Sequence, residues 1–194
     1  MRKVSQLEAI EELSEKIGKE ITEITDKETS LRGAHFARVK EDIISLVLTG
    51  LNLKTLPIEL GALIELNVLD LSKNNFREVP TVLQKLPKLA VLNLSSNQLY
   101  FLPEWLGNFH MLKVLSMANN NLRSLPATIE NLTLLRKIFL QGNDLQRLPF
   151  SLTNLKHLTE IHLDFRTAMR KNVKAVLTAL EANGCHVNAH YNRR

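Results

Sequence analysis

The sequence predicts an α/β solenoid, in which a short motif repeats along the chain and each copy packs on the one before it. The first observation is the skeleton of residues 89–103, which reads L-x-x-L-x-L-x-x-N-x-L-x-x-L-P. The second is its recurrence every 23 residues without insertion, with incomplete copies at both ends. A chain of 194 residues built in this way is one domain with one shared core. The six units begin at Ile43, Leu66, Leu89, Leu112, Leu135 and Leu158.

Each unit starts with alternating apolar and variable residues, which is the period of a β-strand with one buried face. Successive strands are expected to lie parallel, about 4.8 Å apart, with right-handed crossovers between them. The six units therefore predict a parallel sheet of about six strands in a right-handed coil.

An asparagine follows the strand in the four regular units, at Asn74, Asn97, Asn120 and Asn143. An amide can both donate and accept hydrogen bonds, so each asparagine can satisfy backbone groups of its own turn and of the adjacent coil. We predict a structural ladder of asparagines rather than a binding site. Leu51 and Arg166 occupy this position in the first and last units, where the ladder should be missing.

The Leu-Pro pair that ends each skeleton is followed by apolar residues three apart, which predicts a short helical or 3₁₀ turn. The prolines fit the first helical position, where no N–H is needed. Because these turns are wider than the strands, the stack should curve, with the sheet on its concave side and the turns on its convex side.

Residues 1–42 lack the repeat and are predicted to form a helical N-terminal cap. Apolar residues recur there every three or four positions, and Ser5 with Glu8 indicates a capping box. Thr25 could open a second helix that extends toward Val39. A cap is needed because the first coil would otherwise expose its leucines. A partner-binding helix is the alternative.

Residues 167–194 are predicted to form the C-terminal cap. Apolar residues from Met169 to Leu180 follow helical spacing, and Gly184 lies just past the predicted helix end. Residues 185–191 alternate and could add a last strand.

The skeleton of residues 43–166 resembles the leucine-rich repeat family, and its Leu-Pro ending is similar to the intracellular, Ras-suppressor-like class of 23-residue repeats. The resemblance implies a non-catalytic module that binds a partner protein. Some bacterial pathogens deliver similar repeats into host cells, so an effector acting in host cytoplasm is one alternative. An accessory or regulatory enzyme subunit, such as a ubiquitin-ligase adaptor, is another. Nucleic-acid binding is a third, disfavoured because the net charge of +5 is diffuse.

The composition of the chain bears on its cellular location. The first residues lack the apolar region of a secretory signal, and the sequence contains no run of 18 apolar residues that would span a membrane. The single cysteine, Cys185, cannot form an intramolecular disulfide. A cytoplasmic monomer is therefore the expectation, although signal-independent secretion would leave no trace in the sequence.

The sequence carries no phosphate loop, dinucleotide fingerprint or nucleophile elbow. Cys185, His186 and His190 invite a metal hypothesis. In a strand, however, the two histidines would be roughly 13 Å apart, at about 3.3 Å per residue, and the cysteine would face the other way. One tetrahedral metal cannot take all three. No catalytic, cofactor or metal site and no small-molecule substrate are expected.

The variable strand residues should form columns on the concave face, the middle one containing Val47, Asp70, Asn93, Ser116, Phe139 and His162. In its C-terminal part, Phe139 lies among three cations, which is unusual on a solvated face. We predict that this surface binds a partner of acidic character, and an ordinary soluble surface is the alternative. The predicted residues are Lys113, Arg136, Lys137, Phe139 and His162, with the smaller Asp70, Asn93 and Ser116.

A second candidate patch consists of Tyr100, Phe101 and Trp105. At these positions the other units mostly place polar residues. The three rings either pack against each other or contact a partner from the edge or the convex side.

Overall fold

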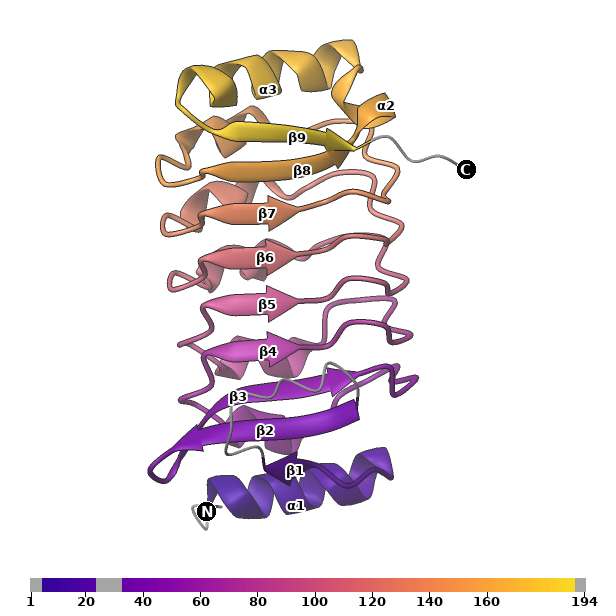
Figure 1. The fold of residues 1–194 in the computed structure, drawn as a ribbon, viewed down its shortest axis with the longest axis vertical. Helices are drawn as coiled ribbons and strands as arrows, with labels where there is room; N and C mark the ends of the chain where they lie inside the picture. The colour runs from indigo at the N-terminus through magenta and orange to yellow at the C-terminus, as the bar shows by residue number, and fades with distance from the viewer. Residues whose placement is uncertain (1–4, 24–32, 191–194) are drawn as a thin grey trace.

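The computed structural model of the protein describes residues 5–23 and 33–190. Its strands form one nine-stranded sheet in sequence order, and Figure 1 shows them stacked from one end of the molecule to the other. The strands are β1 (Thr22–Glu23), β2 (Gly33–Val39), β3 (Asp42–Thr49), β4 (Val68–Asp70), β5 (Val91–Asn93), β6 (Val114–Ser116), β7 (Lys137–Phe139), β8 (Glu160–Asp164) and β9 (His186–His190). The helices are α1 (Gln6–Ile17), α2 (Phe165–Ala168) and α3 (Lys171–Ala182).

The six predicted repeat strands are confirmed as β3 to β8, which pair in parallel. Their register follows the repeat, since Leu46 pairs with Leu69 and Leu69 with Leu92. The sheet has nine strands rather than six because β1, β2 and β9 extend it at its two ends. Leucines from all six units contribute to one buried core.

A 3₁₀ turn follows each Leu-Pro pair, as predicted. The turns are η1 (Ile58–Ala62), η2 (Thr81–Lys85), η3 (Glu104–Asn108), η4 (Ala127–Asn131) and η5 (Phe150–Asn154). Of these, η2 follows Val79-Pro80 in the same position. The placement of the prolines is corrected by one position. Each stands at the N-cap with an extended or near-extended backbone, for example Pro57 at ψ 154°, and not at the first helical residue.

The asparagine ladder is present. Asn97 donates to the carbonyl oxygens of Leu71, in the preceding coil, and of Leu94, in its own coil, at 3.1 and 3.0 Å. Its Oδ1 accepts from the N–H of Phe76 at 3.1 Å. Each amide therefore joins two coils, and the asparagines of the first three regular units are buried.

The N-terminal cap is helical in its first part only. α1 has the predicted capping box between Ser5 and Glu8 and lies against η1, where it closes the end of the core. Lys16 pairs with Glu59 of that turn and holds the pKa of this carboxyl below its usual value.

The second predicted helix is wrong where the chain is described, and its proposed start at Thr25 lies outside the described residues. Residues 33–39 form β2, antiparallel to β3. The backbone of β3 needs partners on its outer side, and β2 supplies them, so pairing prevails over helical propensity.

The C-terminal cap is as predicted. α3 buries Val173, Val176, Leu177 and Leu180. Gly184 then adopts φ 85°, a left-handed conformation that favours glycine. The chain returns to add β9 in parallel to β8. No helix in the described ranges has the length and apolar character to cross a bilayer.

Candidate functional site

The open face of the sheet is the face whose side chains point away from the leucine core, and it is the face predicted to be concave. Strand register places Asp70, Asn93, Ser116, Phe139 and His162 in one row across β4 to β8. The predicted middle column is therefore present. Its two parts differ in what holds the side chains.

In the N-terminal and central part, polar side chains bond to one another. Asp70 accepts hydrogen bonds from Thr49 Oγ1 at 3.2 Å, in the preceding coil, and from Asn93 Nδ2 at 2.9 Å, in the next coil. It also accepts one from the backbone N–H of Ser72, two residues further along its own coil, at 2.8 Å. Ser116 Oγ lies 2.6 Å from the hydroxyl of a neighbouring serine on the preceding coil. We call this chain of contacts the polar network. Its members are Thr49, Asp70, Ser72, Asn93, Ser95 and Ser116.

In the C-terminal part, three rings stack across β7, β8 and β9. Phe139 stacks on His162 with ring centroids 4.4 Å apart and planes at 26°. His162 stacks on His190 at 5.2 Å and 15°. We call these three residues the aromatic row. Phe139 and His162 were predicted for this surface, whereas His190 was not.

Hydrogen bonds fix the central ring of the aromatic row. His162 Nδ1 lies 2.9 Å from His190 Nε2, so one of these nitrogens donates to the other. On the other side of the ring, Nε2 lies 3.3 Å from Asn188 Nδ2 and 3.4 Å from Glu160 Oε2. The ring is therefore held on both sides, and Phe139 packs on a preformed surface.

The three predicted cations divide into one paired and two unpaired. Lys137 Nζ lies 2.7 Å from Glu160 Oε1. This contact is the main cause of a lowered pKa of the Glu160 carboxyl, and the hydrogen bond from His162 is the second cause. Lys113 and Arg136 are exposed and have no ion pair among the described residues. They stand at the entries of β6 and β7, where their charges can meet a carboxylate.

The second candidate patch separates into two parts. The Trp105 ring makes an edge contact with the buried Phe109, with centroids 6.0 Å apart and planes at 85°. Tyr100 and Phe101 remain 59% and 56% exposed. The three predicted rings therefore do not form one cluster.

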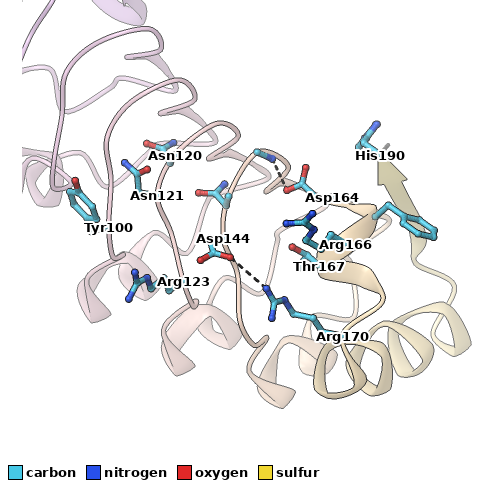
Figure 2. Close-up of a pocket in the computed structure, with 13 residues that line it drawn as sticks. Tyr100, Asn120, Asn121, Arg123, Asp144, Asp164, Arg166, Thr167, Arg170 and His190 are labelled. Atoms are coloured by element: carbon cyan, nitrogen blue, oxygen red, sulfur yellow. Dashed lines mark hydrogen bonds and ion pairs between the residues drawn. The ribbon is translucent and has the colours of Figure 1, made fainter. Parts of the chain in front are cut away.

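Beside Tyr100 the surface opens into a hollow of about 730 Å³, which we call the arginine hollow. It lies where the chain leaves strands β6 to β8, and its far wall is the segment around α2. Figure 2 shows Tyr100 and Arg123 on one side and Arg166 and Arg170 on the other, with Asp144 between them and Asp164 beside Arg166. Sequence reasoning missed this site, although Arg166 in the asparagine position signalled that the ladder ends there. Its charged and aromatic lining residues are Tyr100, Arg123, Asp144, Asp164, Phe165, Arg166, Arg170 and His190.

The residues that invited the metal hypothesis do not gather into a site among the described residues. Cys185 is buried, and this burial raises the pKa of its thiol to about 11, so the thiol is protonated at neutral pH. Within the described ranges, no three His, Cys, Asp or Glu side chains gather as metal ligands would.

Comparison with known families finds similarity within the repeat region of the chain. A leucine-rich repeat family model matches residues 44–99, and a second leucine-rich repeat model matches residues 111–132. Among curated proteins, none matches the sequence significantly.

Three similar solved structures carry the same fold. A leucine-rich repeat protein of Leptospira interrogans has a TM-score of 0.50 and 23% identity, covering 79% of this chain and 52% of the other. A chain from the Toll–Spätzle complex of Drosophila has a TM-score of 0.52 and 30% identity, covering 58% of this chain and 16% of the other. An internalin of Listeria monocytogenes has a TM-score of 0.50 and 17% identity, covering 76% of this chain and 50% of the other. The chain thus spans about half the length of two of these proteins and a smaller part of the third.

Proposed function

We propose that this chain, which belongs to the leucine-rich repeat family, is a non-catalytic module that binds a partner protein through the C-terminal part of its open face. Leucine-rich repeats generally mediate protein–protein interaction and are typically not enzymes, which supports this class of function. Nothing in the described residues favours a host-cell effector or an enzyme adaptor over another protein-binding role. A cytoplasmic setting is proposed on the single buried cysteine.

The observation that carries the proposal is the aromatic row. Interface anchors are commonly aromatic rings that can be fully desolvated by a partner. Phe139 is half-buried and rests on a histidine ring that is hydrogen-bonded in place. A partner that covers it would gain apolar contact without ordering a loop, which keeps the entropic cost of binding low.

The chemistry of the neighbours indicates the partner's charge. Lys113 and Arg136 stand directly before β6 and β7, the second of which carries Phe139, and have no ion pair among the described residues. An acidic partner surface would be complementary to them. Exposed charges of this kind accelerate association more than they tighten the complex.

The test begins with affinity capture by the full chain and mass spectrometry, followed by surface plasmon resonance with the purified partner. Phe139→Ala should weaken binding by about 1–3 kcal/mol, as truncation of an interface anchor does. Reversing the charges of Lys113 and Arg136 should mainly slow association and reduce its dependence on salt.

Val68→Ala is the matched control, since Val68 lies on the same open face but on β4, three strands from Phe139. This variant should bind like the wild type. If Phe139→Ala also binds like the wild type while Tyr100→Ala abolishes binding, the open face is not the interface and the exposed edge at Tyr100 is.

A further inference from the structure

The arginine hollow exists because the repeat stops. In the preceding coils, an asparagine of the next coil closes each turn. Asn120 Oδ1 accepts from the N–H of Leu99 at 3.0 Å, and Asn143 Oδ1 accepts from the N–H of Leu122 at 2.9 Å. Arg166 stands where the next asparagine would be, and the chain turns into α2 instead of covering the last turn.

The hollow therefore leaves the turn after β7 open to a ligand. It is bounded by Tyr100 and Arg123 on one side and by the segment around α2 on the other (Figure 2). A volume of about 730 Å³ falls within the range of small-ligand sites. That space accommodates one large side chain together with its flanking peptide groups.

Both carboxylates that line the hollow have a partner within the protein, whereas two of its three guanidinium groups have no ion pair among the described residues. Asp144 Oδ1 lies 3.6 Å from Arg170 Nη2, and Asp164 Oδ2 accepts from the N–H of Gly142 at 2.8 Å. Arg123 and Arg166 are exposed and form no ion pair in the part of the chain that the structure describes. Guanidinium groups can donate two parallel hydrogen bonds to a carboxylate or a phosphate, the geometry that makes arginine the usual residue for such groups.

We propose that the arginine hollow is a second binding site, which shares only His190 with the aromatic row and takes an anionic side chain carried by a peptide segment of a protein partner. Arg123 and Arg166 bind the anionic group from opposite sides. Tyr100, 59% exposed at the wall, packs against the flanking residues of the peptide. The anionic group is a carboxylate or a phosphoryl group, because both present oxygens that match the guanidinium fork.

The experiment uses the full ¹⁵N-labelled chain and three short peptides with blocked ends. The peptides are Gly-Glu-Gly, Gly-phosphoserine-Gly and Gly-Ser-Gly. We expect saturable NMR shifts at the N–H groups of Asn121 and Gly142 and at the side-chain N–H of Arg123 and Arg166. Whichever charged peptide binds more tightly identifies the source of the anion, and the uncharged peptide should produce no saturable shift.

Variants with equal changes in charge provide the control. Lys54 and Arg77 occupy the Tyr100–Arg123 column in earlier coils and are exposed. Arg123→Glu with Arg166→Glu should weaken peptide binding about tenfold or more, since hydrogen bonds between charged groups are lost. Lys54→Glu with Arg77→Glu should leave binding unchanged.

Two outcomes would overturn the proposal. One is the absence of saturable shifts with either charged peptide. The other is equal loss of binding in the two double variants, which would indicate attraction to overall charge. Phe139→Ala should leave peptide binding intact, so failure of the hollow and failure of the open face are distinguished in the same set of proteins.

Discussion

The central coils, with β4 to β6, and the last coils, with β7 and β8, come from the same 23-residue unit but use their exposed positions differently. The cap strand β9 pairs with β8 at the end of the last coils. In the central coils, the polar side chains of the open face bond to each other, and the asparagine of each coil closes the turn before it. In the last coils, the ladder ends, the face carries aromatic rings, and Arg136 and Arg166 have no ion pair among the described residues. Coils whose polar groups bond to each other act as a scaffold. Where the repeat pattern ends, rings and charged side chains remain available for binding.

The largest effect on stability is expected from the ladder. Asn120→Ala removes the acceptor of Leu99 N–H and the donor to Leu94 and Met117, all buried within the stack. Leaving such groups unpaired should lower the free energy of unfolding by roughly 1–3 kcal/mol. Urea denaturation of the full chain measures this loss.

Asn143→Ala is the matched comparison because it makes the same kinds of contact at the last turn. Its amide is only half-buried, since no asparagine coil follows it, so water can replace part of what is lost. We expect a smaller destabilisation than for Asn120→Ala. Equal losses at the two positions would show that the last turn is closed as firmly as the central ones.

The second-largest loss of stability is expected when the polar network is interrupted. Asp70→Ala removes the acceptor shared by Thr49, Ser72 and Asn93. The group is partly exposed, so the loss should be nearer about 1 kcal/mol, with no change in partner affinity. Denaturation and surface plasmon resonance on the same protein provide the two readings. A large loss of affinity without a loss of stability would place the interface over the central coils instead.

Truncation of Phe139 in the aromatic row should weaken partner binding more than it lowers stability, which is the opposite of the result expected for Asp70→Ala. Phe139→Ala removes one stacked pair, which contributes about 0.5–1.5 kcal/mol beyond the buried area. Stability should therefore fall less than with Asn120→Ala, while partner binding falls most. Thermal denaturation of the full chain checks the first part. A destabilisation as large as that of Asn120→Ala would mean that the ring is structural, and its effect on binding could then be indirect.

The same contrast explains what the sequence could and could not predict. The strands, the 3₁₀ turns and the ladder were predictable because each unit contacts a copy of itself, so that the period determines the register, as at Leu69 and Leu92. The strand β2 was not predictable, because pairing along β3 depends on a long-range contact that no local pattern records. The position of His190 beside His162 was also missed, since the two residues are 28 positions apart and the chain between them departs from the repeat. The hollow follows from one substitution, Arg166 for asparagine, whose effect depends on the path of the chain after it.

The smallest effect concerns the ion pair of the last coils. The folded-state pKa of Glu160 lies below its ordinary value of 4.5, mainly because of the contact with Lys137 and secondly because of the contact with His162. A carboxyl with a depressed folded pKa stabilises the fold above pH 4.5, and that contribution is lost as the pH falls through the folded pKa. Lys137→Gln removes the larger cause, so the Glu160 midpoint should rise toward 4.5 while His162 keeps it below that value. Side-chain carboxyl NMR measures the midpoint.

Lys113→Gln removes the same charge from a nearby exposed position without a contact to Glu160, and it should leave the midpoint in place. An equal rise in both variants would mean that the general positive field lowers the pKa, and not the contact with Lys137. The last coils would then act as one diffuse basic surface toward a partner. A rise only in Lys137→Gln would show that Lys137 is engaged with Glu160, which leaves Lys113 and Arg136 as the cations that remain for an acidic partner.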